Sequence, residues 1–92
     1  MIVSFTNQQV AALFDDQSVT RWRSIERQAR RRLLYLNAAS TLEQLRLPPG
    51  NHLEALRNDR KGQHSIRIND QWRICFRWDD GNAHEVEITD YH

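Results

Sequence analysis

The 92-residue chain contains a single cysteine and no long apolar run. With Cys75 alone, no disulfide can form within the chain. No apolar stretch approaches the roughly 20 residues that a bilayer-spanning helix needs. Residues 1–5 lack the charged start and the long apolar stretch of a signal peptide. We therefore expect a cytoplasmic protein that makes no contact with a membrane.

Lysine is almost missing, because Lys61 is the only one among 13 basic residues and the others are arginines. The planar guanidinium of arginine binds phosphate bidentately and stacks on bases, so this bias is more informative than the net charge of +1. Alternatively, arginine-rich helices only present a solvated face. The composition alone therefore leaves nucleic-acid binding open.

The first half of the chain predicts two helices after a short first strand at residues 2–5. Thr6-Asn7-Gln8-Gln9 has the pattern of a capping box, with Thr6 as the N-cap of the first helix. The second helix is expected from about Thr20 to Leu36. Its apolar residues recur at spacings of three and four and so share one face: Trp22, Ile25, Ala29, Leu33 and Leu36. Glu26 and Arg30 are placed to pair on that helix.

The second half predicts antiparallel strands. Residues 48–51, Pro-Pro-Gly-Asn, end all helix. Strands are then expected at residues 53–56, 65–68, 72–78 and 83–89, with hairpin turns at Asn69-Asp70 and at residues 79–82. Residues 1–92 are thus expected to form one α+β domain, with two N-terminal helices packed on a small antiparallel sheet.

Alternation sorts the side chains of the strand at residues 72–78. The aromatic residues and Ile74 point one way, whereas Arg73, Cys75 and Arg77 point the other. If the helices cover the apolar face, Arg67, Arg73 and Arg77 share the open face, which suits a phosphate backbone. The alternative is an ordinary polar face neutralised by two glutamates, Glu85 and Glu87. Cys75 is expected only to pack.

The chain ends with Asp90-Tyr91-His92, which follow a strand pattern directly. A terminus that is held by a sheet is ordered. An acid, a phenol and an imidazole are therefore expected at one edge of the fold, as a functional site would need. The four histidines show no metal-ligand spacing and there is one cysteine, so no metal site and no cofactor are expected.

Several segments resemble one known family. Residues 57–76 read R-N-D-R-K-G-Q-H-S-I-R-I-N-D-Q-W-R-I-C-F, which looks like the core of the HigB toxins of RelE-type toxin–antitoxin systems. Residues 87–92 match the D-Y-H ending of these toxins, and residues 2–5 and 47–56 match as well. The resemblance implies a toxin with a microbial-ribonuclease-like sheet that enters the ribosomal A site and cleaves mRNA. It also implies a HigA-type helix-turn-helix antitoxin, through which alone operator DNA is contacted.

The resemblance also assigns the catalytic residues. In such ribonucleases the ribose 2′-OH attacks the adjacent phosphorus, which needs a base, cations and an acid. His92 is the expected acid or base, Tyr91 donates a proton or stacks on a base, and Asp90 completes the ending. Arg73 is expected to bind the scissile phosphate.

Two positions depart from the family pattern. Well-matched members carry a histidine at the position of Glu54 and a lysine at that of Arg57. Arg57 still neutralises phosphate but does not act as a base at neutral pH. Glu54 takes the base role or, alternatively, only faces solvent. We therefore expect slower mRNA cleavage than in members that keep both residues.

The remaining cations are assigned to contact with RNA and the ribosome: Arg60, Lys61, His64, Arg67 and Arg77. Two alternatives stay open. One is a toxin of the same fold that poisons DNA gyrase. The other is a degenerate toxin that acts mainly in operon regulation.

Overall fold

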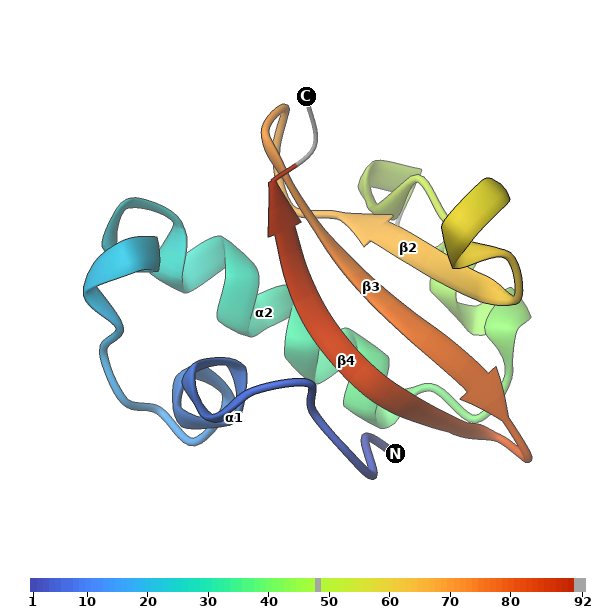
Figure 1. Cartoon of the computed structure of the whole chain (residues 1–92), viewed down its shortest axis with the longest axis horizontal. Helices are drawn as coiled ribbons and strands as arrows, with labels where there is room; N and C mark the ends of the chain where they lie inside the picture. The colour runs from blue at the N-terminus through green and yellow to red at the C-terminus, as the bar shows by residue number, and fades with distance from the viewer. Residues whose placement is uncertain (48, 91–92) are drawn as a thin grey trace.

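The computed structural model describes residues 1–47 and 49–90. Two helical segments pack on one face of an antiparallel sheet whose strands follow the order β1-β2-β3-β4 (Figure 1). The strands are β1 (Glu54–Ala55), β2 (Gln63–Arg67), β3 (Trp72–Asp79) and β4 (Asn82–Asp90). The helices are α1 (Gln8–Phe14) and α2 (Glu26–Ala38), with 3-10 turns η1 (Thr20–Ile25), η2 (Leu42–Arg46), η3 (Pro49–Asn51) and η4 (Asn58–Arg60). The predicted α+β fold is confirmed, although η3 adds a helical turn where none was expected.

The N-terminal segment lies along the edge of β4 rather than forming a fifth strand. It makes two isolated parallel bridges, Ile2 to Ala83 and Phe5 to Val86. The backbone N–H of Thr6 donates to the Val86 carbonyl at 3.0 Å, which draws Thr6 to this edge. The predicted capping box is therefore wrong, and Asn7 is the N-cap of α1, its side-chain oxygen accepting from the backbone N–H of Val10 at 3.0 Å.

The predicted second helix is divided at its start. Trp22 has φ −116° and ψ 20°, so a 3-10 turn precedes α2 instead of one continuous helix. The indole of Trp22 is 1% exposed and meets that of Trp72 edge-on, with ring centroids 6.5 Å apart. The predicted apolar face is nevertheless confirmed, because all five of its residues are buried. Glu26 and Arg30 also pair as predicted, at 3.7 Å.

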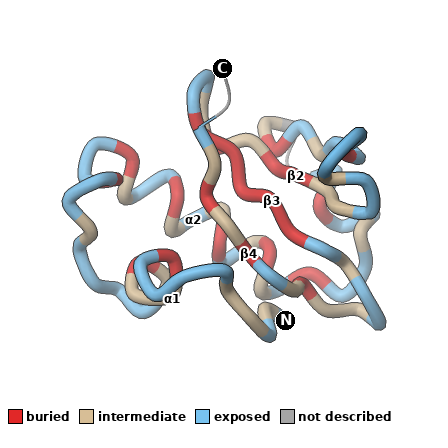
Figure 2. Tube along the Cα trace, viewed as in Figure 1, coloured by how far each residue is buried: buried red, intermediate tan, exposed pale blue. Residues whose placement is uncertain are grey.

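The two hairpins of the sheet use the turn residues that the sequence indicated. Asp80 and Gly81 both have positive φ, 51° and 77°, as a two-residue type I′ turn requires. In the other hairpin, the side-chain oxygen of Asn69 accepts from the backbone N–H groups of Gln71 and Trp72. Buried residues lie along α2 and along the middle of the sheet, where those of β3 form an unbroken run from Trp72 to Phe76 (Figure 2). Within the described residues, no helix is long and apolar enough to cross a membrane.

Leu33 and Leu34 are adjacent in α2 and test this packing directly, because Leu33 is 0% and Leu34 is 54% exposed. We expect Leu33→Ala to lower the free energy of unfolding by about 2–5 kcal/mol, since it leaves a cavity. Leu34→Ala is expected to change it by less than about 1 kcal/mol. Urea unfolding of the two variants measures both values, and equal losses would contradict the packing.

Candidate active site

The outer face of the sheet, which is the face turned away from α2, carries polar side chains in rows across the strands. Paired residues of antiparallel strands point to the same face. The register pairs Glu54 with Ser65, Ser65 with Cys75, and Cys75 with Glu87. A neighbouring row pairs Arg67 with Arg73 and Arg73 with Thr89. The outer face thus extends from Glu54 on β1 to Glu87 and Thr89 on β4.

Arg73 lies at the centre of this face but is only 7% exposed. Its Nε donates to Ser65 Oγ at 2.8 Å, and its Nη2 donates to the His52 carbonyl at 2.7 Å. Arg73 thus lies on the predicted face, but the face is not open at this position, because the segment before β1 covers the side chain. These bonds fix the orientation of the guanidinium before any ligand arrives.

The turn η4 lies over the outer face. In Figure 1 it is the yellow turn on the viewer's side of β2, whereas α2 lies behind the sheet. Arg60 at the end of η4 donates to Glu87 on β4 at 2.9 Å and to Gln63 at 3.0 Å. The Arg60–Glu87 ion pair connects η4 to β4. The site therefore lies between the sheet and η4.

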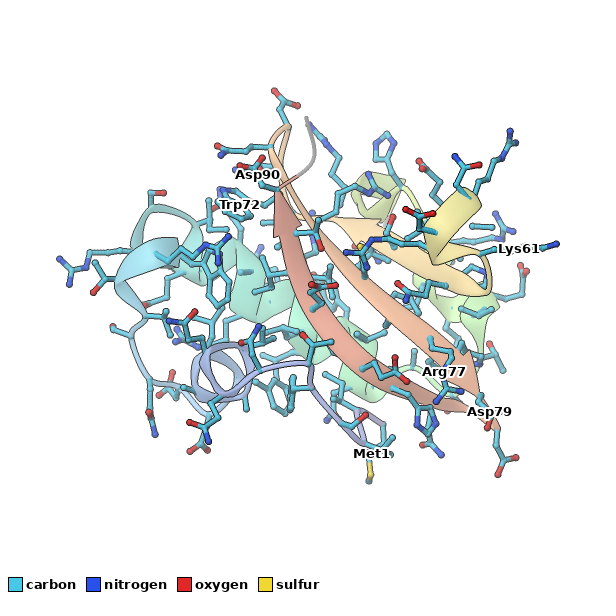
Figure 3. All side chains as sticks on the ribbon, in the orientation of Figure 1. Met1, Lys61, Trp72, Arg77, Asp79 and Asp90 are labelled. Carbon is cyan, nitrogen blue, oxygen red and sulfur yellow. The ribbon has the colours of Figure 1, made fainter. Side chains whose placement is uncertain are left out.

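Two further predicted RNA contacts on this face are engaged within the protein. Arg67 pairs with Asp70, and Arg77 pairs with Glu85 at 3.4 Å. The Arg77–Glu85 and Arg60–Glu87 pairs confirm that two glutamates of β4 neutralise part of the basic face. The described part of the chain gives Lys61 no ion pair, and its side chain projects away from the fold in Figure 3.

Glu54 and Arg57 lie together at the edge of the sheet. Both are exposed, and residues 54–58 line one shallow groove. Glu54 is on β1, and Arg57 precedes η4 as its N-cap. The spacing of three residues thus brings a carboxylate and a guanidinium to the same groove, at the border of the outer face.

The C-terminal cluster is described only in part. Asp90 ends β4, pairs with Trp72 in the register and accepts from Gln71 Nε2 at 3.2 Å. Figure 3 labels Asp90 and Trp72 at the same end of the sheet, opposite the end that carries Arg77 and Asp79. The assignments of Tyr91 and His92 fall outside the described residues. The strand expected to lead to the ending is therefore present up to Asp90, but the pairing with Trp72 turns Asp90 to the helix side rather than to the outer face.

His64 does not join the other predicted RNA contacts. It alternates with Ser65 and therefore points to the helix side, where its ring stacks on that of Phe76, with the ring centroids 6.3 Å apart. Burial, helped by the charge of Arg46, lowers the pKa of His64 below its usual value. A neutral ring on the helix side adds no positive charge to the outer face.

Cys75 is fully buried on the outer face and is not part of an accessible site. Burial raises the pKa of its thiol, more than Thr89 and the nearby arginines lower it. The packing role predicted for Cys75 is confirmed. Sequence reasoning missed Ser65, which anchors Arg73; the alternation pattern that placed Ser65 on the face of Arg67 was the available signal.

Comparisons with known proteins identify the family of the chain. The family model for HigB-like toxins, described as RelE-like toxins of the type II toxin–antitoxin system HigB, matches residues 3–92. Toxin HigB-1 of Vibrio cholerae is 39% identical over 85 residues, which cover 90% of each chain. An uncharacterised protein of Haemophilus influenzae is 32% identical over 58 residues, 63% of this chain and 57% of its own length.

A solved structure shares the fold at low identity. The YoeB–YefM complex from Staphylococcus aureus contains a chain with a TM-score of 0.53 and 15% identity, and the match covers 100% of this chain and 98% of that one. This likeness shows the fold alone, whereas the family model and the Vibrio cholerae relative show the family. The chain therefore belongs to the RelE-like HigB toxins of type II toxin–antitoxin systems.

Proposed function

We propose that this toxin is a metal-independent endoribonuclease that cleaves mRNA in the ribosomal A site. The observation that carries the proposal is the buried Arg73, which Ser65 and His52 hold on the outer sheet face. A fixed cation costs little reorganisation when negative charge develops on a phosphate. The family match over residues 3–92 supports the same reading.

The reaction assigned to this face is attack of the ribose 2′-OH on the adjacent phosphorus. Glu54 is exposed at the border of the face and takes the proton of the 2′-OH. Arg73 and Arg57 neutralise the phosphorane. His92, which follows Asp90 by two residues in the sequence, protonates the leaving 5′-oxygen, and Tyr91 stacks on a base or donates a proton.

The partner that we propose is a HigA-type antitoxin with a helix-turn-helix domain. The family is that of type II toxin–antitoxin systems, and the structural neighbour is itself a toxin–antitoxin complex. The antitoxin neutralises the toxin and represses their shared operon. Operator DNA is then contacted by the antitoxin, and the toxin reaches DNA only through it.

A gyrase-directed toxin of the same fold is the alternative, and pulse-labelling of cells after induction separates the two. Because an mRNA endonuclease removes the templates of translation, we expect incorporation of labelled amino acid to stop before that of labelled thymidine. His92→Ala is expected to leave both incorporations unchanged. An early stop of thymidine incorporation would contradict the proposal.

Glu54 and Arg57 are expected to limit the rate of cleavage. Because histidine is the better general base near neutral pH, we expect the double variant Glu54→His, Arg57→Lys to cleave mRNA on programmed ribosomes at least about tenfold faster. The matched control is Glu43→His, Arg46→Lys, since these exposed residues have the same spacing on η2. A rate that is unchanged or lower in the first variant would rule out this assignment.

A further inference from the structure

The arginines of this toxin fall into two groups according to their partners. Four arginines of the sheet side, Arg60, Arg67, Arg73 and Arg77, are engaged by carboxylates, hydroxyls or carbonyls, whereas the described residues give Arg57 no such partner. Across residues 1–47 and 49–90, by contrast, the side chains of Arg23, Arg27 and Arg31 are exposed and make no hydrogen bond or ion pair.

These unpaired arginines line one groove on η1 and α2. The residues that line it are all polar or charged, and the aliphatic parts of their side chains contribute to its surface: Arg23, Ser24, Glu26, Arg27, Gln28, Arg31 and Arg32. The one carboxylate among them, Glu26, is paired with Arg30 at 3.7 Å, and Arg32 donates to Asn51 at 2.9 Å. The charge of Arg23, Arg27 and Arg31 is therefore left uncompensated. We call this surface the α2 groove.

The arrangement works against the stability of the helix. Arg27 and Arg31 are four residues apart in α2, so two like-charged side chains leave the same face of the helix, with their Cα atoms about 6 Å apart along the axis. Such a pair of like charges destabilises a helix. The groove thus concentrates positive charge where folding does not require it.

We propose that the α2 groove is a second RNA-binding surface, which holds the phosphate backbone of structured RNA. Guanidinium groups bind phosphate bidentately, and interfaces with nucleic acid are more polar and more positive than those between proteins. A protein partner would be expected to meet an apolar or aromatic anchor, and the lining of the groove contains none. The groove therefore fits RNA better than an acidic protein segment.

The α2 groove and the candidate active site lie on different sides of the molecule. The apolar face of α2 packs on the inner face of the sheet, whereas η4 and Arg73 belong to the outer face. Figure 1 shows the sheet between α2 and η4. One RNA is thus bound at the outer face while another is bound behind it. This inference deepens the proposed function and rests on it, because ribosomal RNA is the structured RNA that surrounds an mRNA in the A site.

The test compares Arg27→Gln and Arg31→Gln with Arg46→Gln. Each variant removes one charge from an exposed helical arginine, but Arg46 is already paired with Glu43 at 3.2 Å. Binding of a short fluorescent A-form RNA duplex is measured by anisotropy across a range of salt concentrations. We expect each groove variant to weaken binding about fivefold. We also expect it to lower the slope of log affinity against log salt concentration by roughly 0.7–0.9, as loss of one phosphate contact does. Arg46→Gln is expected to behave as the unchanged toxin.

The possible outcomes separate this inference from the proposed function. Equal affinities and slopes in all three variants would overturn the α2 groove as an RNA site. Binding of poly-L-glutamate as tightly as RNA, lost in the same variants, would also overturn it, in favour of an acidic protein partner. If the unchanged toxin binds the duplex through the groove but cleaves no mRNA on programmed ribosomes, the groove stands and the proposed function fails.

Discussion

The buried guanidinium of Arg73 is the interaction around which the outer sheet face is organised. A buried charge is costly unless hydrogen bonds replace its lost water. Here the Ser65 hydroxyl and the His52 carbonyl supply them, from β2 and from the segment before β1. The charge therefore ties three parts of the chain together. The same bonds leave the cation in one orientation, as a site that stabilises phosphate charge requires.

The distribution of the other cations follows from this organisation. On the outer face, glutamates of β4 offset part of the positive charge, and the Arg60–Glu87 pair also holds η4 above the sheet. In the proposed mechanism, this neutralisation leaves one defined place for a phosphate on the outer face. Uncompensated charge remains on α2, where Arg27 and Arg31 face solvent, and at the edge of the sheet, where the described residues give the exposed Arg57 and Lys61 no ion pair. Catalysis and general attraction to RNA are thus assigned to separate surfaces.

The sequence predicted those features that depend on local pattern. Helical spacing identified the buried face of α2, and Asp80-Gly81 identified a hairpin, because each follows from backbone geometry within a few residues. Features set by distant contacts were missed. The Val86 carbonyl draws Thr6 away from its capping role, and the segment at His52 covers Arg73. Alternation tells which face a side chain takes, but it does not tell what later covers that face.

Primer extension on an mRNA in a purified translation system, with and without ribosomes, tests the central claim most directly. It compares the unchanged toxin with His92→Ala. The account predicts cuts that appear only with ribosomes and that the substitution abolishes, since an mRNA held in the A site meets a catalytic C-terminus. An absence of cuts in every lane, or equal cutting by both proteins, would contradict it.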